Sequence, residues 1–226
     1  MIQIKNLENC IEFQEDKVIT LGINNKKMFS LVCEAFLLED DQCVEVIKVF
    51  DQNNKEIDKQ SFIVINQLPI LPFDNKKLIE KMYKSLDKSI EIDVNAYERI
   101  NNLGREIEAE LKNFSVSKYG TYAFALDWNV IKFLKAYKYS VNLSHCENFY
   151  DKLCEFIKFL ADARVDDPLV FINLKTFLEE KELNGLFELL IFYNIKALLI
   201  ENWHTSKQSN YEVKYRCDLD FIETIS

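Results

Sequence analysis

The sequence predicts an α/β fold, a mostly parallel β-sheet flanked by helices, with a helical subdomain inserted into it. Short apolar runs of strand length alternate with segments of helical periodicity in the first and last thirds of the chain. Two long segments of helical periodicity lie between them. Strand and helix alternate in the last third, as in a parallel sheet covered on both faces. At 226 residues the chain is long enough for one core with an elaboration.

The first third of the chain predicts a strand, a loop and a helix, followed by further strands. Residues 17–21 form a short apolar run that ends at Gly22, and residues 27–38 then carry apolar side chains at helical spacing. The runs 44–50 and 62–68 are apolar or rich in β-branched residues, and a polar turn at 51–55 follows the first of them. We expect both runs to be strands of the same sheet.

The character of the sequence changes after Pro72, where two long helices are predicted. Apolar residues recur every four positions from Leu78 to Ile90, and mostly every three, four or seven positions from Val94 to Leu111. Asp93 is suited to cap the second helix, which places the break between the helices at residues 89–93. We expect the two helices to form an antiparallel pair.

The remaining segments complete the inserted subdomain and the sheet. Residues 113–127 alternate in part around Gly120 and predict a hairpin or an extended ribbon, and residues 128–137 return to helical spacing. The last third predicts a helix capped by Ser144, a strand, a helix, a strand and a β-rich edge segment, at residues 144–160, 169–174, 179–193, 196–201 and 211–222. Residues 1–74 and 140–226 are thus predicted to share one α/β head, into which residues 75–139 insert as a helical leg.

The chain is acidic overall, which taken alone argues against a nucleic-acid partner. Its net charge is −9 and its isoelectric point is near 4.9. Residues 75–139 carry twelve Lys or Arg against nine Asp or Glu, a net charge of +3, so the remaining residues carry −12. A mildly basic segment on an acidic body fits a protein that meets phosphates with one face, although chance can produce the same asymmetry.

Five lysines in this basic segment are candidate DNA-binding residues. Lys132, Lys135 and Lys138 recur every three residues and share one arc of the predicted helix, and Lys112 and Lys118 lie upstream. Lysine makes point-charge contacts with a phosphate backbone, whereas the whole chain has only four arginines for bidentate base recognition. The composition therefore favours sequence-independent binding. The alternative is that these lysines form a solvated helix face that keeps the protein soluble.

Three acidic residues could form a calcium site. Glu106 and Glu110 stand four residues apart on one helical face, and Asp127 follows the predicted ribbon. Calcium takes several carboxylate and carbonyl oxygens as ligands. Acidic exposed helix faces are also common, so a solvated surface explains the same residues.

The sequence lacks the motifs of nucleotide hydrolysis and of nucleophilic catalysis. A P-loop requires G-x-x-x-x-G-K-[ST], whereas Lys27 stands where the second glycine after Gly22 belongs. The run 169–173 ends in Asn173, where an NTPase would place a magnesium-binding Asp. His145 and His204 form no triad pattern. We therefore expect a protein that is not an enzyme and that binds no nucleotide.

The cysteines and the hydropathy pattern indicate the compartment. The six cysteines lie in mostly apolar segments without a CxxC pair, as expected of buried, reduced thiols. No run approaches the roughly eighteen apolar residues that a membrane span requires, and the first seven residues have no signal-peptide pattern. We expect a cytoplasmic protein without a membrane partner.

Two long segments resemble the Csn-two family of type II-A CRISPR adaptation proteins. SFIVINQLPILPFDNKKLIEKM, at residues 61–82, is similar to the junction of head and leg in that family. DPLVFINLKTFLEEKELNGLFELLIFYNIKALLIEN, at residues 167–202, resembles its C-terminal strand, helix and strand block, including the Asn that ends the first strand. Length, acidity and the missing P-loop also fit, so the resemblance covers essentially the whole chain.

The resemblance implies a degenerate P-loop-NTPase-like head, a helical leg and a homotetrameric ring with a positively lined hole that binds linear duplex ends. It further implies a role in spacer acquisition, alongside the CRISPR adaptation integrase and the effector nuclease. The family is associated with structural calcium held by an acid-rich stretch of the leg, but residues 113–126 contain no Asp or Glu. If calcium is retained, Glu106, Glu110 and Asp127 are its candidate ligands.

The leading hypothesis is therefore non-enzymatic binding of double-stranded DNA by a ring whose subunits add together modest lysine patches. One alternative is an acidic scaffold that bridges protein partners without touching DNA. The other alternative is a nucleotide-sensing protein with a P-loop-like fold.

Overall fold

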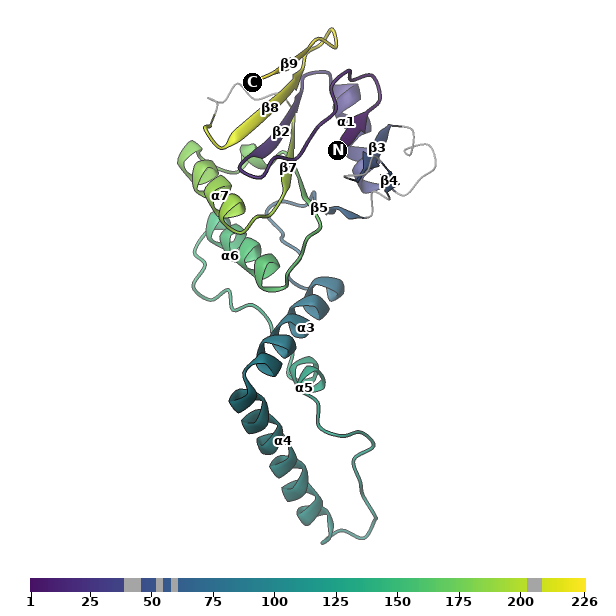
Figure 1. Cartoon of the computed structure of the whole chain (residues 1–226), viewed down its shortest axis with the longest axis vertical. Helices are drawn as coiled ribbons and strands as arrows, with labels where there is room; N and C mark the ends of the chain where they lie inside the picture. Colours follow the sequence, from purple (N-terminus) through teal and green to yellow (C-terminus); the bar gives the residue numbers. More distant parts are fainter. Residues whose placement is uncertain (39–45, 52–54, 58–60, 203–208) are drawn as a thin grey trace. The chain divides into compact units, whose positions relative to one another are not determined.

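The computed structural model describes residues 1–38, 46–51, 55–57, 61–202 and 209–226 (Figure 1). They divide into two compact units. Unit 1 comprises Met1–Pro72, Ser144–Lys158 and Asp166–Ser226, and unit 2 comprises Phe73–Leu143 and Phe159–Val165. The predicted start of a strand at residue 44, part of the turn at 51–55, and His204 lie outside the described residues.

A mostly parallel sheet forms the centre of unit 1, so the predicted α/β class is confirmed. Within the described residues the sheet has six strands in the order β5-β6-β7-β2-β8-β9. All neighbouring strands are parallel except β8 and β9. The strand bounds, in sheet order, are Ile63–Ile65, Leu169–Ile172, Ala197–Glu201, Val18–Ile23, Glu212–Cys217 and Glu223–Ile225.

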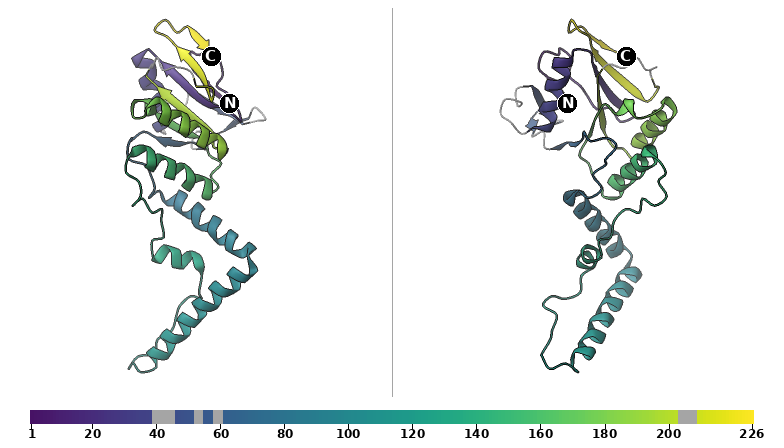
Figure 2. Two further views of the ribbon diagram at one scale, coloured as in Figure 1. Left: turned by 90° about the vertical axis from the view of Figure 1, so that its left-hand side faces the viewer. Right: turned by 180° about the vertical axis from the view of Figure 1, so that it is seen from behind.

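Helices cover both faces of this sheet because its central strands are apolar on both. Every residue of β2 and of β7 is buried. Helix α1 (Lys26–Leu37) contributes Met28 and Val32 to the same hydrophobic core as Ile19 and Leu21 of β2. Helix α7 (Glu180–Phe192) lies on the opposite face, as the right-hand view of Figure 2 shows. The P-loop-like detail of the head stays a prediction.

A second, smaller sheet corrects one expectation. Strands β1 (Ile2–Ile4), β3 (Ile47–Phe50) and β4 (Glu56–Ile57) pair antiparallel in the order β1-β3-β4. The run 44–50 was expected in the main sheet, which is wrong, whereas 62–68 does contribute β5. The cause is one-sided burial: Ile47 and Val49 are buried while Lys48 is exposed, so β3 has an apolar face on one side only.

Two further expectations for unit 1 are wrong in position. The segment 211–222 was expected at the sheet edge, but β8 pairs with β2 on one side and with β9 on the other, so β9 is the edge strand. Helix α6 (Phe149–Asp162) begins after Asn148, whose Oδ1 accepts the N–H of Asp151 at 2.9 Å. Ser144 therefore does not cap it.

The two long helices predicted after Pro72 are present in unit 2, and the second extends past its predicted end. Helix α3 spans Lys76–Ile92 and α4 spans Val94–Ser115. Asp93 separates them and caps α4, since its Oδ1 accepts the N–H of Ala96 at 3.0 Å. The predicted helix break is thus confirmed.

The expected antiparallel pairing of α3 and α4 is wrong. Helix α4 leaves the end of α3 at a bend and extends away from it (Figure 2). Only Asp93 lies between the two helices, which is shorter than the two to five residues that reverse the chain in a helical hairpin. The buried side chains of α3 are Leu78, Met82 and Tyr83, all in its first half.

A short third helix and an irregular segment complete unit 2. Helix α5 spans Val130–Ala136, within the predicted 128–137. No hairpin forms at 113–127, where a hairpin or an extended ribbon was expected, because α4 continues through Ser115 and residues 116–129, all of them described, contain no strand. None of the described helices is long and apolar enough to span a membrane.

Candidate nucleic-acid interface

Trp128 fixes the segment that carries the α5 lysines. Its ring packs against Gly104, so closely that a Cβ at position 104 would lie 2.1 Å from Trp128 Cδ2. Within α4, all of whose residues are described, only Gly104 is buried. The ring of Phe133 in α5 packs at a tilt against Trp128 with ring centres 5.3 Å apart, and the ring of Tyr137 packs in the same way against Phe133 at 4.5 Å. Gly104 of α4 therefore leaves room for the Trp128 ring, against which α5 packs.

Local hydrogen bonds then orient α5. Asn129 caps the helix, because its Oδ1 accepts the backbone N–H of Lys132 at 3.0 Å. Val130 and Leu134 are buried, which leaves Lys132 and the other lysines of this helix exposed. The helix ends at Ala136, and Lys138, two residues later, has a left-handed backbone with φ of 52°. All five predicted lysines are exposed.

The structure separates the five lysines into two groups within unit 2. Lys132, Lys135 and Lys138 belong to α5 and the residues just after it. Lys112 lies in the last turn of α4, with its Nζ 5.8 Å from the ring centre of Phe124. Lys118 lies in the turn that follows α4, and Figure 1 places this end of α4 far from α5.

Charge pairing distinguishes one lysine from the other four. Lys135 Nζ donates to Glu80 Oε1 of α3 at 3.1 Å, and this hydrogen bond is the main reason that the pKa of Glu80 lies below its ordinary value. Among the residues that the structure describes, Lys112, Lys118, Lys132 and Lys138 form no ion pair. Lys135 and Lys138 also line a cavity of about 480 Å³.

The three acids predicted to hold calcium are not brought together with other ligands. Glu106 and Glu110 are exposed on α4, and Asp127 is exposed just before Trp128. In the part of the chain that the structure describes, no group of three or more His, Cys, Asp or Glu residues could hold a metal ion. Calcium binding by these residues stays a prediction.

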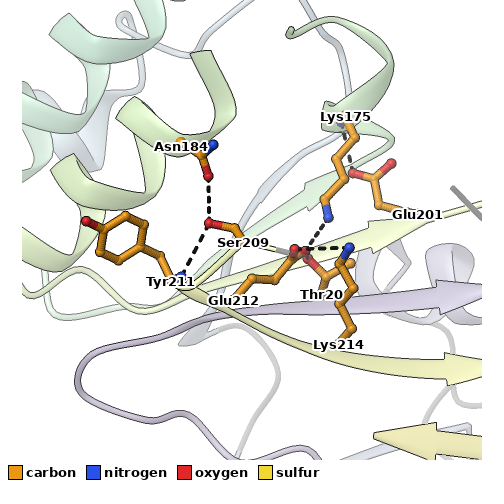
Figure 3. A network of polar contacts seen from close by, with 8 residues as sticks. All are labelled: Thr20, Lys175, Asn184, Glu201, Ser209, Tyr211, Glu212 and Lys214. Carbon is orange, nitrogen blue, oxygen red and sulfur yellow. Dashed lines mark hydrogen bonds and ion pairs between the residues drawn. The ribbon is translucent and has the colours of Figure 1, made fainter. Parts of the chain in front are cut away.

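A buried network of charges lies in unit 1, on the α7 side of the sheet (Figure 3). Glu212 of β8 is its centre and accepts hydrogen bonds from Thr20 Oγ1 of β2 and from Lys175 Nζ. Lys214 Nζ lies 3.4 Å from the other carboxylate oxygen of Glu212. Burial is the main cause that lowers the pKa of Lys214.

Glu201, at the end of β7, joins the same network. Its Oε1 accepts the backbone N–H of Lys175 at 3.0 Å in the 3-10 turn η2 (Leu174–Thr176). Burial raises the pKa of Glu201 to about 7, because desolvation outweighs that hydrogen bond. A neighbouring chain of hydrogen bonds joins Tyr211 N–H to Ser209 Oγ at 3.3 Å and Ser209 Oγ to Asn184 Oδ1 at 2.6 Å (Figure 3).

Sequence reasoning missed this network. The only signal was the alternation of charged and apolar residues in EVKYRC, residues 212–217, which is equally typical of a strand with one solvated face. Burial of its charged face follows from Thr20 and Lys175, which lie on other elements.

The turn between β2 and α1 is where a P-loop would lie in a nucleotide-binding fold. Only Asn24 and Asn25 separate the two elements. Asn25 Oδ1 accepts the N–H groups of Lys27 and Met28 at 3.1 and 3.2 Å. These N–H groups at the start of α1 are thereby capped within the chain.

The comparison with protein families decides the family. A family model described as CRISPR-associated protein (Cas_Csn2) matches residues 39–220. The chain belongs to the Cas_Csn2 family. The Cas_Csn2 match contains all of unit 2 and the buried charges of η2, β7 and β8, while β2 and α1 precede it. No curated protein matches the sequence.

Proposed function

We propose that this protein binds double-stranded DNA, preferentially at linear ends, as a homotetrameric ring that acts in the acquisition of CRISPR spacers without enzymatic activity. Membership of the Cas_Csn2 family supports the CRISPR context. The resemblance of the sequence to type II-A adaptation proteins supports the ring, the preference for ends, and the integrase and effector nuclease as partners.

The exposed lysines of unit 2 are the observation that carries DNA binding. Lys112, Lys118, Lys132 and Lys138 are exposed, and no ion pair from the described residues neutralises them. Residues 75–139, with a net charge of +3, contain all four. Ammonium groups of this kind neutralise phosphates and release counterions, which gives sequence-independent, salt-sensitive binding.

An apolar stripe on α4 supports self-association. Leu103, Ile107, Leu111 and Phe114 are spaced by four, four and three residues, so they share one face of the helix. Their side chains are between 50% and 73% exposed in the single chain. Contiguous exposed apolar surface of this kind is typical of protein interfaces, and a second copy of α4 would bury it.

The β2–α1 turn supports the non-enzymatic part of the proposal. Phosphate-binding loops wrap the ligand with unpaired backbone N–H groups at a helix start. In this chain Asn25 takes the N–H groups of Lys27 and Met28. The buried ammonium groups of Lys175 and Lys214 stand on the adjacent strands and turn, where they neutralise Glu212.

Competition between linear and circular DNA tests the proposal. A labelled linear duplex is bound at low salt and challenged with the same linear duplex or with a covalently closed circle of equal sequence. We expect only the linear competitor to displace the probe. Equal competition would replace threading over an end with lateral binding, and no binding at low salt would favour a scaffold that contacts proteins alone.

Charge reversal locates the binding surface. Lys132→Glu with Lys138→Glu should abolish most of the affinity and lower the dependence of binding on salt. Lys26→Glu with Lys27→Glu makes the same charge change on exposed residues of α1 in unit 1 and is the matched control. Equal losses in both variants would show that net charge, and not the α5 surface, governs binding.

A further inference from the structure

A cavity in unit 2 combines aromatic rings, lysines and two carboxylates, those of Asp74 and Glu80. It has a volume of about 480 Å³ and lies among α3, the end of α5 and the segment after it. Phe73, Tyr83 and Tyr139 supply rings to its lining, and Lys76, Lys135 and Lys138 supply ammonium groups. Its volume is in the range of about 300–1,000 Å³ that small-molecule sites occupy.

The cavity is held open by buried contacts. Tyr83 is 4% exposed, and its hydroxyl donates to the backbone oxygen of Tyr139 at 2.8 Å. The left-handed residue Lys138 turns the chain after α5, and the N–H of Tyr139 bonds back to the oxygen of Leu134 at 3.0 Å. The ring of Tyr139 itself is 53% exposed, so it can receive a planar ligand. The backbone around the cavity is therefore fixed before any ligand arrives.

The charges of the cavity are suited to a ligand with an anionic end and an amino group. Lys76 and Lys138 are exposed and make no ion pair among the described residues. Lys135 donates a hydrogen bond to Glu80 and lowers the pKa of that carboxyl group, so Lys135 itself is already paired. A phosphate is thus directed to Lys76 and Lys138, while the carboxylates of Asp74 and Glu80 can accept hydrogen bonds from an amino group.

We infer that this cavity binds a nucleoside 5′-monophosphate group. Aromatic side chains stack on nucleobases whatever their sequence, and lysines bind the phosphate as point charges. We assign this group to the 5′-terminal nucleotide of a DNA end, and this assignment rests on the proposed function. Glu80 then favours bases with an exocyclic amine over thymine, because thymine offers no amino donor in this position.

Binding of a free mononucleotide tests the site without any DNA duplex. Deoxyadenosine 5′-monophosphate is titrated into the full-length protein by calorimetry. Lys76→Ala should weaken its affinity about tenfold, as expected for loss of a hydrogen bond to a charged group. Lys77→Ala is the matched control, since Lys77 is the neighbouring exposed lysine of α3 and does not line the cavity. Tyr139→Ala should also weaken binding, and thymidine 5′-monophosphate should bind more weakly than the adenine nucleotide.

A second arm separates a DNA end from a free nucleotide. Linear duplexes of one sequence are compared with a 5′-phosphate and with a 5′-hydroxyl, and the phosphorylated end should bind more tightly and compete with the mononucleotide. The inference is overturned if the mononucleotide does not bind, or if Lys76→Ala and Lys77→Ala have equal effects. If the mononucleotide binds but the two duplexes bind equally well, the assignment to a DNA end is overturned. If Lys76→Ala leaves the affinity for the duplex unchanged, the proposed function stands and this cavity is not the site.

Discussion

The contact between Gly104 and Trp128 predicts a reversal of the usual effect of glycine replacement in a helix. Replacing a helix-interior glycine by alanine normally stabilises by about 1 kcal/mol, since alanine has the higher helix propensity. At Gly104 the added Cβ would lie 2.1 Å from Cδ2 and 2.2 Å from Cε2 of Trp128. Overpacking of this kind costs about 1–3 kcal/mol and outweighs the propensity gain, so Gly104→Ala should lower the free energy of unfolding by up to about 2 kcal/mol.

Removing the indole of Trp128 should make Gly104→Ala stabilising again. In a Trp128→Ala background nothing opposes the new methyl group, so Gly104→Ala should stabilise by about 1 kcal/mol. The coupling between the two positions is then the overpacking cost of about 1–3 kcal/mol, which a double-mutant cycle measures directly. Ala109→Gly, at an exposed position of the same helix, calibrates the propensity difference.

Urea unfolding followed by circular dichroism provides the four free energies of the cycle. The midpoint should shift with little change in slope, because the surface exposed on unfolding is nearly the same in each variant. Weakened DNA binding by Gly104→Ala is expected as well, because Trp128 holds the α5 lysines in place. If Gly104→Ala stabilises the protein equally with and without the indole, the two residues do not pack together and the description of unit 2 fails.

The α4 stripe predicts that Ile107→Glu with Leu111→Glu converts the proposed oligomer to monomers in size-exclusion chromatography with light scattering; an oligomer of unchanged mass would move the interface elsewhere. Burial holds the pKa of Glu201 near 7 against 4.5 when unfolded, so the folded state keeps a proton that the unfolded state releases. The free energy of unfolding should therefore fall as pH rises from about 4.5 to about 7, and Glu201→Gln should flatten that slope in urea titrations. Glu212→Gln should cost about 3 kcal/mol by removing the charge that pairs with the buried ammonium groups of Lys175 and Lys214, whereas Glu15→Gln, at an exposed position, should cost little.

The helices of unit 2 were predictable because the spacing of apolar residues within one segment is enough to indicate an amphipathic helix. Leu78 and Met82 recur at four-residue spacing and are buried. Ile107 and Leu111 keep a similar spacing but are about half exposed. The period shows that a helix has an apolar face but does not show what covers it, so the expected antiparallel pair of α3 and α4 was wrong.

Strand membership depended on a finer signal that the sequence does contain. Every residue of β2 is apolar or small, as required of a strand covered on both faces, whereas Lys48 interrupts the apolar residues of β3. This difference separates the two sheets, and length or β propensity alone does not. The position of β8 was not predictable in this way, because its charged face is buried only through partners from β2 and η2.

The same limit applies to the candidate interface. Spacing of three residues places Lys132, Lys135 and Lys138 on one arc of a helix, which the sequence shows without a structure. Their availability to phosphate depends on residues far away in the chain: Glu80, 55 positions before Lys135, pairs with that lysine, whereas no described acid pairs with Lys132. Binding energy from counterion release scales with the phosphates actually neutralised, so the lysines that contribute are set by such tertiary pairing and not by the count of basic residues.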